Sequence, residues 1–193
     1  MKRIAVYCGA ASPADPVYLD SARAVGAGLA ERGIGLVYGG GRLGLMGALA
    51  DGALAAGGEV IGVIPQLLVE AEVAHQGLSA LEVVGTMHER KARFTELADG
   101  FITLPGGTGT MDELWEALSW AQLGYHADPV GLLNIAGYYD ELIAFWEKMG
   151  RTGFVRPQHQ GLLIVGDTLD ALLAAMAGWR GATPIAQMAR EHL

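Results

Sequence analysis

The stretch that decides the fold is Leu104-Pro105-Gly106-Gly107-Thr108-Gly109-Thr110-Met111-Asp112-Glu113. It completes an apolar run at residues 100–104 and leads directly into an amphipathic helical pattern at residues 110–123. Three glycines between a strand and a helix let the backbone approach a ligand closely and adopt φ values that a side chain would forbid. The free N–H groups at the start of the helix, with the positive end of its dipole, form a site for an anion. The sequence therefore predicts a phosphate cradle, with the Glu113 carboxylate carried one turn into the same helix.

Short apolar runs alternate with helical patterns along the whole chain. This alternation indicates a parallel sheet covered by helices on both faces, the doubly wound α/β architecture. The expected strands are residues 3–8, 35–38, 59–64, 81–84, 100–104, 130–134 and 162–165. The expected helices are residues 16–32, 44–56, 86–98, 110–123, 138–149 and 168–177. Ligands of such sheets bind beyond the carboxyl ends of the strands, where the strand order switches.

Length and composition favour a single domain over residues 1–193, long enough to bury a core of its own. Residues 178–193 form a tail that either docks as a short helix or frays. The net charge of −8 argues against a nucleic-acid partner, because a duplex binder needs a basic surface. No apolar stretch of about 18 residues lacks Gly, Pro or charge, so no membrane span is expected. The first strand begins too early to leave room for a signal peptide, and the single cysteine, Cys8, fits a reducing, cytoplasmic location.

Two further glycine-rich loops, at residues 9–13 and 39–44, follow strands and are expected to share the ligand crevice with residues 105–110. The second formally matches G-x-G-x-x-G. A dinucleotide-binding fold also needs an acid at the end of the following strand, whereas Glu59 lies at the wrong end of that strand. The G-x-x-x-x-G-K-[ST] pattern of P-loop nucleoside triphosphatases is absent.

The expected helix at residues 86–98 places cations where the helix dipole disfavours them. Thr86 and Glu89 have the spacing of a capping box, which fixes the start of the helix. The cations that follow are Arg90, Lys91 and Arg93. Each exposed cation near a helix N-terminus costs about 0.3–1 kcal/mol, which a bound anion would offset. The alternative is a solvated basic face that pairs with acidic neighbours such as Glu89 and Glu96.

Glu113 also has two interpretations. Thr110-x-x-Glu113 has the spacing of a second capping box, which needs no function. Glu113 also lies off the apolar stripe of its helix and could face the crevice, and the phosphate loop just before it favours a catalytic role. The five histidines and Cys8 show no ligand spacing in sequence, so no metal site is expected.

Together these motifs resemble the LONELY GUY family, the cytokinin riboside 5′-monophosphate phosphoribohydrolases. The resemblance rests on Met87-His88-Glu89-Arg90-Lys91, Pro105-Gly106-Gly107-Thr108-Gly109-Thr110-Met111-Asp112-Glu113 and Ser119-Trp120-Ala121-Gln122-Leu123-Gly124, and extends through about Gly166. It implies a Rossmann-like sheet, no cofactor, and at least a homodimer with the active site close to the dimer interface. It also implies cleavage of N⁶-substituted adenosine 5′-monophosphates to free base and ribose 5-phosphate.

The resemblance further implies Arg90 and Glu113 as the catalytic pair. The implied substrate contacts are Glu72, Met87, Arg90, Lys91, Gly106, Gly107, Thr108, Gly109, Thr110, Glu113 and Ser119. N-glycosidic cleavage passes through an oxocarbenium-like ribose, which the Glu113 carboxylate can stabilise while it takes a proton from the attacking water. Arg90 is expected to orient the substrate and neutralise charge. The group that protonates the leaving base stays open, with Glu72 as one candidate.

Two alternatives to hydrolysis follow from the same residues. A pyridoxal-dependent decarboxylase needs a Schiff-base lysine and a far larger chain, and this sequence has only Lys2, Lys91 and Lys148. We therefore reject that interpretation. The second alternative is a non-catalytic nucleotide or cofactor carrier with the same Rossmann-like pocket. Glu113 discriminates between a carrier and an enzyme, since a carrier needs no acid near the glycosidic carbon.

Overall fold

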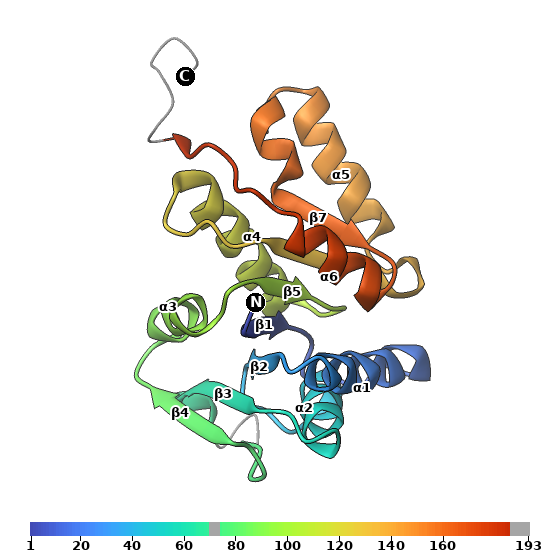
Figure 1. Cartoon of the computed structure of the whole chain (residues 1–193), viewed down its shortest axis with the longest axis vertical. Helices are drawn as coiled ribbons and strands as arrows, with labels where there is room; N and C mark the ends of the chain where they lie inside the picture. The colour runs from blue at the N-terminus through green and yellow to red at the C-terminus, as the bar shows by residue number, and fades with distance from the viewer. Residues whose placement is uncertain (70–73, 186–193) are drawn as a thin grey trace.

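The computed structural model describes residues 1–69 and 74–185, which form one parallel sheet with helices on both faces (Figure 1). The order of the strands across the sheet is β4-β3-β2-β1-β5-β6-β7, and every neighbouring pair is parallel. The strands are β1 (Arg3–Tyr7), β2 (Gly35–Tyr38), β3 (Val60–Pro65), β4 (Ala80–Val84), β5 (Phe101–Thr103), β6 (Val130–Leu133) and β7 (Leu163–Gly166). The doubly wound α/β fold expected from the sequence is confirmed.

Helices connect successive strands and divide between the two faces of the sheet. They are α1 (Pro16–Glu31), α2 (Gly44–Ala55), α3 (Met87–Leu97), α4 (Thr108–Leu123), α5 (Asp140–Arg151) and α6 (Leu169–Ala177). Shorter 3₁₀ turns are η1 (Gln66–Leu68), η2 (Ile135–Gly137) and η3 (Pro157–Leu162). One apolar cluster joins the sheet to α1, α2 and α6, and a second joins its other face to α3, α4 and α5. Figure 1 shows α1 and α2 across the central strands from α3.

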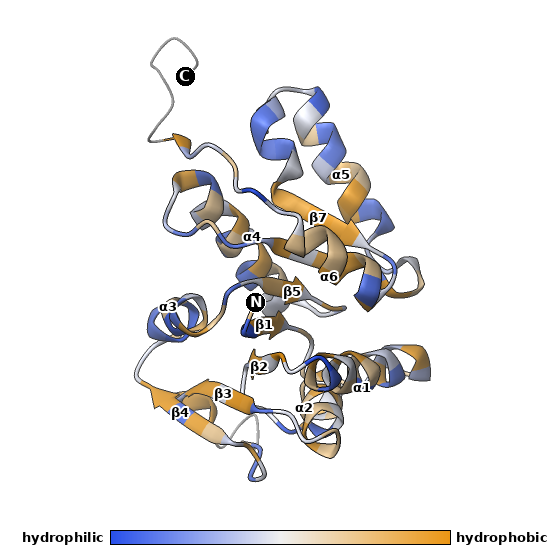
Figure 2. Ribbon diagram, viewed as in Figure 1, coloured by the Kyte–Doolittle hydropathy of each residue, from blue (hydrophilic) through white to orange (hydrophobic). Residues whose placement is uncertain are grey.

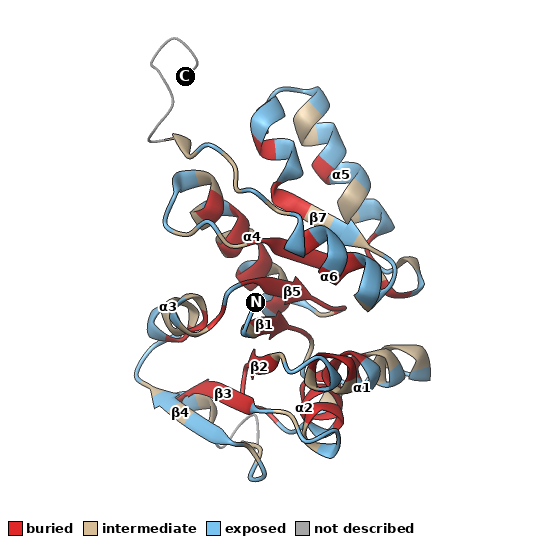
Figure 3. Cartoon of the chain, in the orientation of Figure 1, coloured by how far each residue is buried: buried red, intermediate tan, exposed pale blue. Residues whose placement is uncertain are grey.

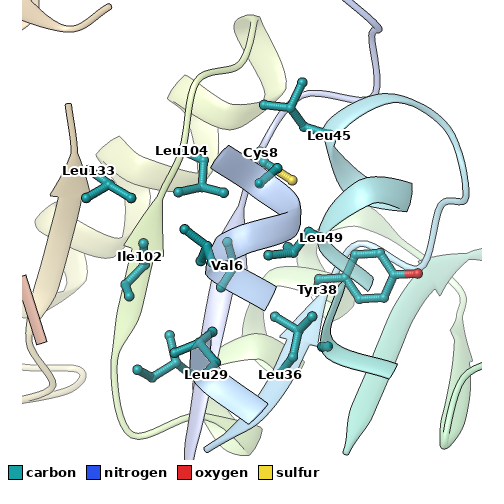
Figure 4. Packing of buried hydrophobic residues seen from close by; sticks show 14 of the residues in the cluster. Val6, Cys8, Leu29, Leu36, Tyr38, Leu45, Leu49, Ile102, Leu104 and Leu133 are labelled. Carbon is teal, nitrogen blue, oxygen red and sulfur yellow. The ribbon is translucent and has the colours of Figure 1, made fainter. Parts of the chain in front are cut away.

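Side chains of the central strands alternate between these two clusters because successive residues of a strand point to opposite faces. Val6, Ile102 and Leu104 pack towards Leu29 and Leu49 of the first two helices (Figure 4). The central strands are buried throughout, whereas the edge strand β4 is apolar in hydropathy yet largely exposed (Figures 2 and 3). No helix in residues 1–69 and 74–185 is long and apolar enough to cross a membrane.

The strand order switches between β1 and β5. From β1 the chain builds β2, β3 and β4 to one side and then returns to place β5 on the other side. The carboxyl ends of these two strands are joined by hydrogen bonds from Leu104 N–H to the Tyr7 carbonyl at 2.9 Å and from Gly9 N–H to the Pro105 carbonyl at 3.1 Å. This edge of the sheet is where a doubly wound fold binds its ligand.

One local expectation is corrected by the structure. The helix expected from residue 110 begins at Thr108, with Gly107 as its N-cap and no side-chain cap, so Thr110 and Glu113 do not form a capping box. Of the tail predicted at residues 178–193, residues 178–184 form no helix, and residues 186–193 lie outside the described part of the chain. Residues 178–184 dock through the Trp179 indole, which donates to the Ala127 carbonyl at 3.2 Å, and through the Thr183 carbonyl, 2.9 Å from the His159 ring.

Candidate functional site

The loop after β5 crosses directly over the end of β1, and glycine makes this approach feasible. A Cβ added at Gly106 would lie 2.1 Å from the Thr110 hydroxyl oxygen and 2.9 Å from the Gly9 nitrogen. A Cβ at Gly9 would lie 3.3 Å from the Gly106 Cα. Gly106 is therefore needed for the loops after β1 and β5 to meet, and a side chain at Gly9 would require the facing loop to shift by a few tenths of an ångström.

The N-terminus of α4 lies beside this contact between the two loops. Its first intrahelical hydrogen bond runs from Met111 N–H to the Gly107 carbonyl at 3.1 Å, so the amides of residues 107–110 have no carbonyl partner within the helix. A Cβ added at Gly107 or Gly109 would meet no atom of the described chain within 4 Å. The amides therefore face space that an anion can occupy, with the favourable end of the helix dipole behind them.

A cavity of about 410 Å³ lies in front of these amides, within the roughly 300–1,000 Å³ typical of small-molecule sites. We call it the substrate cavity. It is lined by Cys8, Gly9, Ala10, Ala11, Met46, Leu68, Met87, Arg90, Gly107, Gly109, Thr110 and Glu113. The first and third glycine-rich loops thus share one crevice, as expected, while the second loop contributes through its contact with Arg90.

Glu113 lies in the second turn of α4, with only 7% of its surface exposed. It is the only carboxylate among the described residues that line the substrate cavity. Burial, reinforced by the Glu113 charge, raises the pKa of the Cys8 thiol and of the Tyr7 hydroxyl well above their ordinary values. Cys8 is therefore a buried, protonated thiol rather than a nucleophile.

Arg90 enters the cavity from α3 and is 3% exposed. Its Nε donates to the Val63 carbonyl of β3 and its Nη2 donates to the Gly39 carbonyl after β2, both at 3.0 Å. The guanidinium carbon also lies 5.6 Å from the centre of the Phe94 ring. A Cβ at Gly39 would lie 2.2 Å from Nη2, so this glycine makes room for the arginine. Arg90 is thereby held in one orientation by a carbonyl within β3 and by the carbonyl just after β2.

The other cations of α3 pair with acids, as the alternative interpretation expected, but mostly with different partners. Lys91 contacts Asp112 at 3.2 Å and Glu116 at 3.0 Å on α4. Burial works to lower the pKa of Lys91, but these ion pairs outweigh it and raise that pKa. Arg93 pairs with Glu82 at 2.6 Å and with Glu96 at 2.8 Å. Lys91 therefore ties the helix that carries Arg90 to the helix that carries Glu113.

The capping box at the start of α3 is present in a modified form. The Thr86 hydroxyl accepts from Glu89 N–H at 3.1 Å, as expected. The Glu89 carboxylate accepts from Gly85 N–H at 2.7 Å, one residue before the cap. Arg90 is thus placed at the fourth helical position, where its long side chain can reach the sheet.

Only some of the remaining predicted site residues line the substrate cavity. Met87 lines the substrate cavity, and Gly106 lines a smaller cavity next to it. Thr108, the first residue of α4, is exposed but is not among the lining residues. Ser119 is exposed six residues beyond Glu113, roughly 9 Å along the helix. Glu72 lies outside the described residues.

Besides Cys8 just after β1, two lining residues were absent from the predicted site, Met46 at the start of α2 and Leu68 in η1. Both residues follow strands whose carboxyl ends meet at this edge of the sheet, and that position in the sequence could have identified them as lining residues. Within residues 1–69 and 74–185, no group of three or more His, Cys, Asp or Glu residues could hold a metal ion.

Comparisons with known proteins identify the family. A family model described as "Possible lysine decarboxylase" matches residues 46–176. "Probable cytokinin riboside 5'-monophosphate phosphoribohydrolase LOGL9" of Oryza sativa subsp. japonica is 48% identical over 172 residues, covering 89% of this chain and 76% of the relative. "Cytokinin riboside 5'-monophosphate phosphoribohydrolase LOG7" of Arabidopsis thaliana is 45% identical over 163 residues, covering 84% and 75%. The chain belongs to the LONELY GUY family.

The fold of this LONELY GUY protein recurs in a solved structure of the Moco Carrier Protein from Chlamydomonas reinhardtii. The two agree with a TM-score of 0.70 at 24% identity, over 92% of this chain and 96% of the other. At that identity the likeness concerns the fold alone.

The lysine decarboxylase description of the family model does not fit the site of this member. None of the three lysines lines the substrate cavity. Lys2 and Lys148 are exposed away from it, and Lys91 is engaged by two carboxylates. The cavity therefore lacks the amine that Schiff-base chemistry requires.

Proposed function

We propose that this chain hydrolyses the N-glycosidic bond of adenosine 5′-monophosphates, including N⁶-substituted ones, to free base and ribose 5-phosphate. Family membership supports the reaction class. The observation that carries the site assignment is that Arg90, Glu113 and the uncapped start of α4 line one cavity.

The 5′-phosphate binds at the amides of residues 107–110 in this proposal. The net charge of −8 repels an anionic substrate over the molecule as a whole, so the phosphate has to be held by local groups. The start of α4 provides N–H donors and a favourable dipole, and the Arg90 side chain in the same cavity adds positive charge. Binding energy at this distant phosphate aligns the ribose with the acid on the next turn.

Glu113 acts on the ribose. As the C1′–N9 bond breaks, positive charge develops on the sugar, and a buried carboxylate stabilises it more strongly than an exposed one would. Glu113 accepts a proton from the attacking water as the new C1′–O bond forms, and the electron pair of the breaking C1′–N9 bond goes to the purine, which takes up one proton from solvent while Glu113 returns its own to solvent. Arg90, fixed by two main-chain carbonyls, orients the substrate rather than supplying that proton, because guanidinium stays protonated at neutral pH.

The base occupies the apolar part of the cavity in this proposal. Met46, Leu68 and Met87 bring flexible or branched apolar side chains to the lining of this cavity. Thioether side chains adapt their shape to different occupants. Such a lining suits a flat purine and tolerates an apolar substituent on it.

A homodimer is part of the proposal. Ser119 is too far along α4 to reach the substrate cavity of its own chain, so any substrate contact it makes comes from a second copy. Apolar side chains that stay exposed, Leu81 and Val83 on the edge strand β4 and Met87 on α3, support such an assembly. Light scattering after size-exclusion chromatography measures the mass directly. The cytoplasmic location expected from the sequence remains a prediction.

The test is product release from AMP and from its N⁶-isopentenyl analogue, with base and ribose 5-phosphate quantified together. Wild-type protein should release both in equal amounts. Glu113→Gln should lower kcat by roughly 10²–10⁴-fold, the usual worth of a general base, while AMP binding is retained. Protein that binds AMP but never yields ribose 5-phosphate would instead be a carrier.

A further inference from the structure

The loop that presents the phosphate-binding amides is held from behind by two consecutive tyrosines. The Tyr138 hydroxyl donates to the Gly106 carbonyl at 2.8 Å, and the Tyr139 hydroxyl donates to the Leu104 carbonyl at 2.7 Å. These contacts span more than 30 residues of sequence. They attach the start of α5 to the end of β5, on the side of the loop away from Arg90 and Glu113.

A second, smaller cavity of about 190 Å³ marks that side, and we call it the rear cavity. Tyr138 and Gly106 line the rear cavity only, whereas Gly107 lines both the rear cavity and the substrate cavity. The Gly106–Gly107 peptide therefore forms part of the wall between the two.

The residues just before the two tyrosines include one in a strained backbone conformation. Ala136 in η2 has φ +52°, a left-handed conformation that residues with a Cβ rarely adopt and that costs roughly 1–3 kcal/mol. Asn134 offsets part of this cost. Its Oδ1 accepts from Tyr139 N–H at 2.8 Å, and its Nδ2 donates to Asp140 at 2.7 Å. The Tyr138 ring packs edge-on against Tyr18 of α1 at 5.7 Å.

The hydrogen bond to the Gly106 carbonyl also fixes the direction of the Gly107 N–H, because both groups belong to one peptide unit. The carbonyl and N–H of a trans peptide point in opposite directions, and the described chain has no cis peptide bond. An oxygen of Gly106 held on the rear side directs the N–H of Gly107 towards the substrate cavity. Two adjacent glycines would otherwise leave this peptide free to rotate. A donor on the carbonyl also polarises the peptide and strengthens its N–H as a donor.

We propose that Tyr138 is a positioning residue that orients the Gly106–Gly107 peptide for recognition of the substrate phosphate. This inference rests on the proposed function. Tyr138 touches the loop rather than the substrate, and its effect passes through one peptide unit. The Tyr139 hydroxyl holds the end of β5, just before this peptide, through its hydrogen bond to the Leu104 carbonyl. Burial raises the pKa of Tyr139 well above its ordinary value, so its hydroxyl remains a donor throughout the working range.

The test compares Tyr138→Phe with Tyr18→Phe, which removes a hydroxyl from the same pair of packed rings. Calorimetry gives the Kd of AMP and of adenosine for otherwise wild-type protein and for both variants, all in the Glu113→Gln background, which retains AMP binding without appreciable cleavage. Tyr138→Phe should weaken AMP binding about five- to tenfold, in line with the loss of one oriented hydrogen bond. It should leave adenosine binding and Tm unchanged, and Tyr18→Phe should leave all three unchanged. The ratio of the two Kd values is the readout that general structural damage would not move.

The other possible results of this experiment separate a failure of the positioning role from a failure of the proposed function. If otherwise wild-type protein prefers AMP over adenosine and Tyr138→Phe keeps the same preference, the positioning role is overturned and the proposed function stands. Equal weakening of AMP and adenosine would also overturn the role, since it marks a structural effect. If otherwise wild-type protein shows no preference for AMP, the phosphate site itself is wrong, and both proposals lose their basis.

Discussion

Adding one methyl group at Gly109 should move stability and affinity in opposite directions. Gly109 is the second residue of α4 and lines the substrate cavity, and a Cβ there would meet no atom of the described chain within 4 Å. Alanine is a better helix former than glycine by roughly 0.8–1 kcal/mol. Gly109→Ala should therefore raise the Tm by roughly 2–4 °C for a chain of this length.

The same methyl group occupies space in front of the phosphate-binding amides. Displacing the phosphate from one charge-assisted hydrogen bond costs about 1.5–3 kcal/mol, which corresponds to a roughly 10- to 150-fold loss of AMP affinity. Binding of adenosine, which lacks the phosphate, should change little. The two opposite signs separate an effect on the site from an effect on folding.

The assay pairs thermal unfolding with calorimetric titration of AMP and adenosine, and the titrations use the Glu113→Gln background so that AMP is bound without appreciable cleavage. Gly161→Ala in η3 is the matched control, because its added Cβ comes no closer than 4.0 Å to another side chain, Trp179, away from the cavity. It should leave AMP affinity unchanged. A Gly109→Ala variant that gains stability and binds AMP as tightly as wild type would refute the assignment of these amides to the phosphate.

Three further changes test the structure around the site. Gly26→Ala should lower the free energy of unfolding by about 1–3 kcal/mol in urea titrations, because the new Cβ would lie 2.0 Å from the Leu49 carbonyl between α1 and α2; unchanged stability would contradict this packing. Arg90→Lys keeps the charge but loses the fork that serves two buried carbonyls, at about 1–3 kcal/mol for each carbonyl left unpaired; a wild-type urea midpoint would argue against those bonds. Hydrogen bonds from Arg93 hold the pKa of Glu82 below its ordinary value. The folded chain thus binds this proton more weakly than the unfolded chain, so the stabilisation is present above about pH 4.3 and is lost as the pH falls through the folded pKa. Glu82→Gln should make the acid limb of Tm against pH shallower, and an identical limb would refute the linkage.

Much of the fold was predictable from the sequence because its signals are local. Apolar runs between helical patterns located the strands and helices, and the glycine-rich loops marked the carboxyl edge of the sheet. The start of α4 was placed two residues late, at Thr110, because Thr110 and Glu113 imitate a capping box. The structure begins this helix at Thr108, since Gly106 packs against Gly9 from a different strand, and no local pattern reports that contact.

The residues of the site were likewise predictable where local motifs mark them and not where only the folded chain brings them together. Arg90 and Glu113 were selected from motifs, and the structure brings both to one cavity. The carboxylate partners of Lys91 lie on another helix, 21 and 25 residues along the chain, so sequence spacing could not assign them. Tyr138 went unnoticed for the same reason, because its link to Gly106 exists only once the chain has folded.

The most direct measurement is a crystal structure of the Glu113→Gln variant with AMP bound and uncleaved. We expect phosphate oxygens about 2.7–3.2 Å from amide nitrogens of residues 107–110, with the C1′ atom of the ribose beside the side chain at position 113. A phosphate bound elsewhere, or a side chain at position 113 turned away from the sugar into solvent, would contradict this expectation.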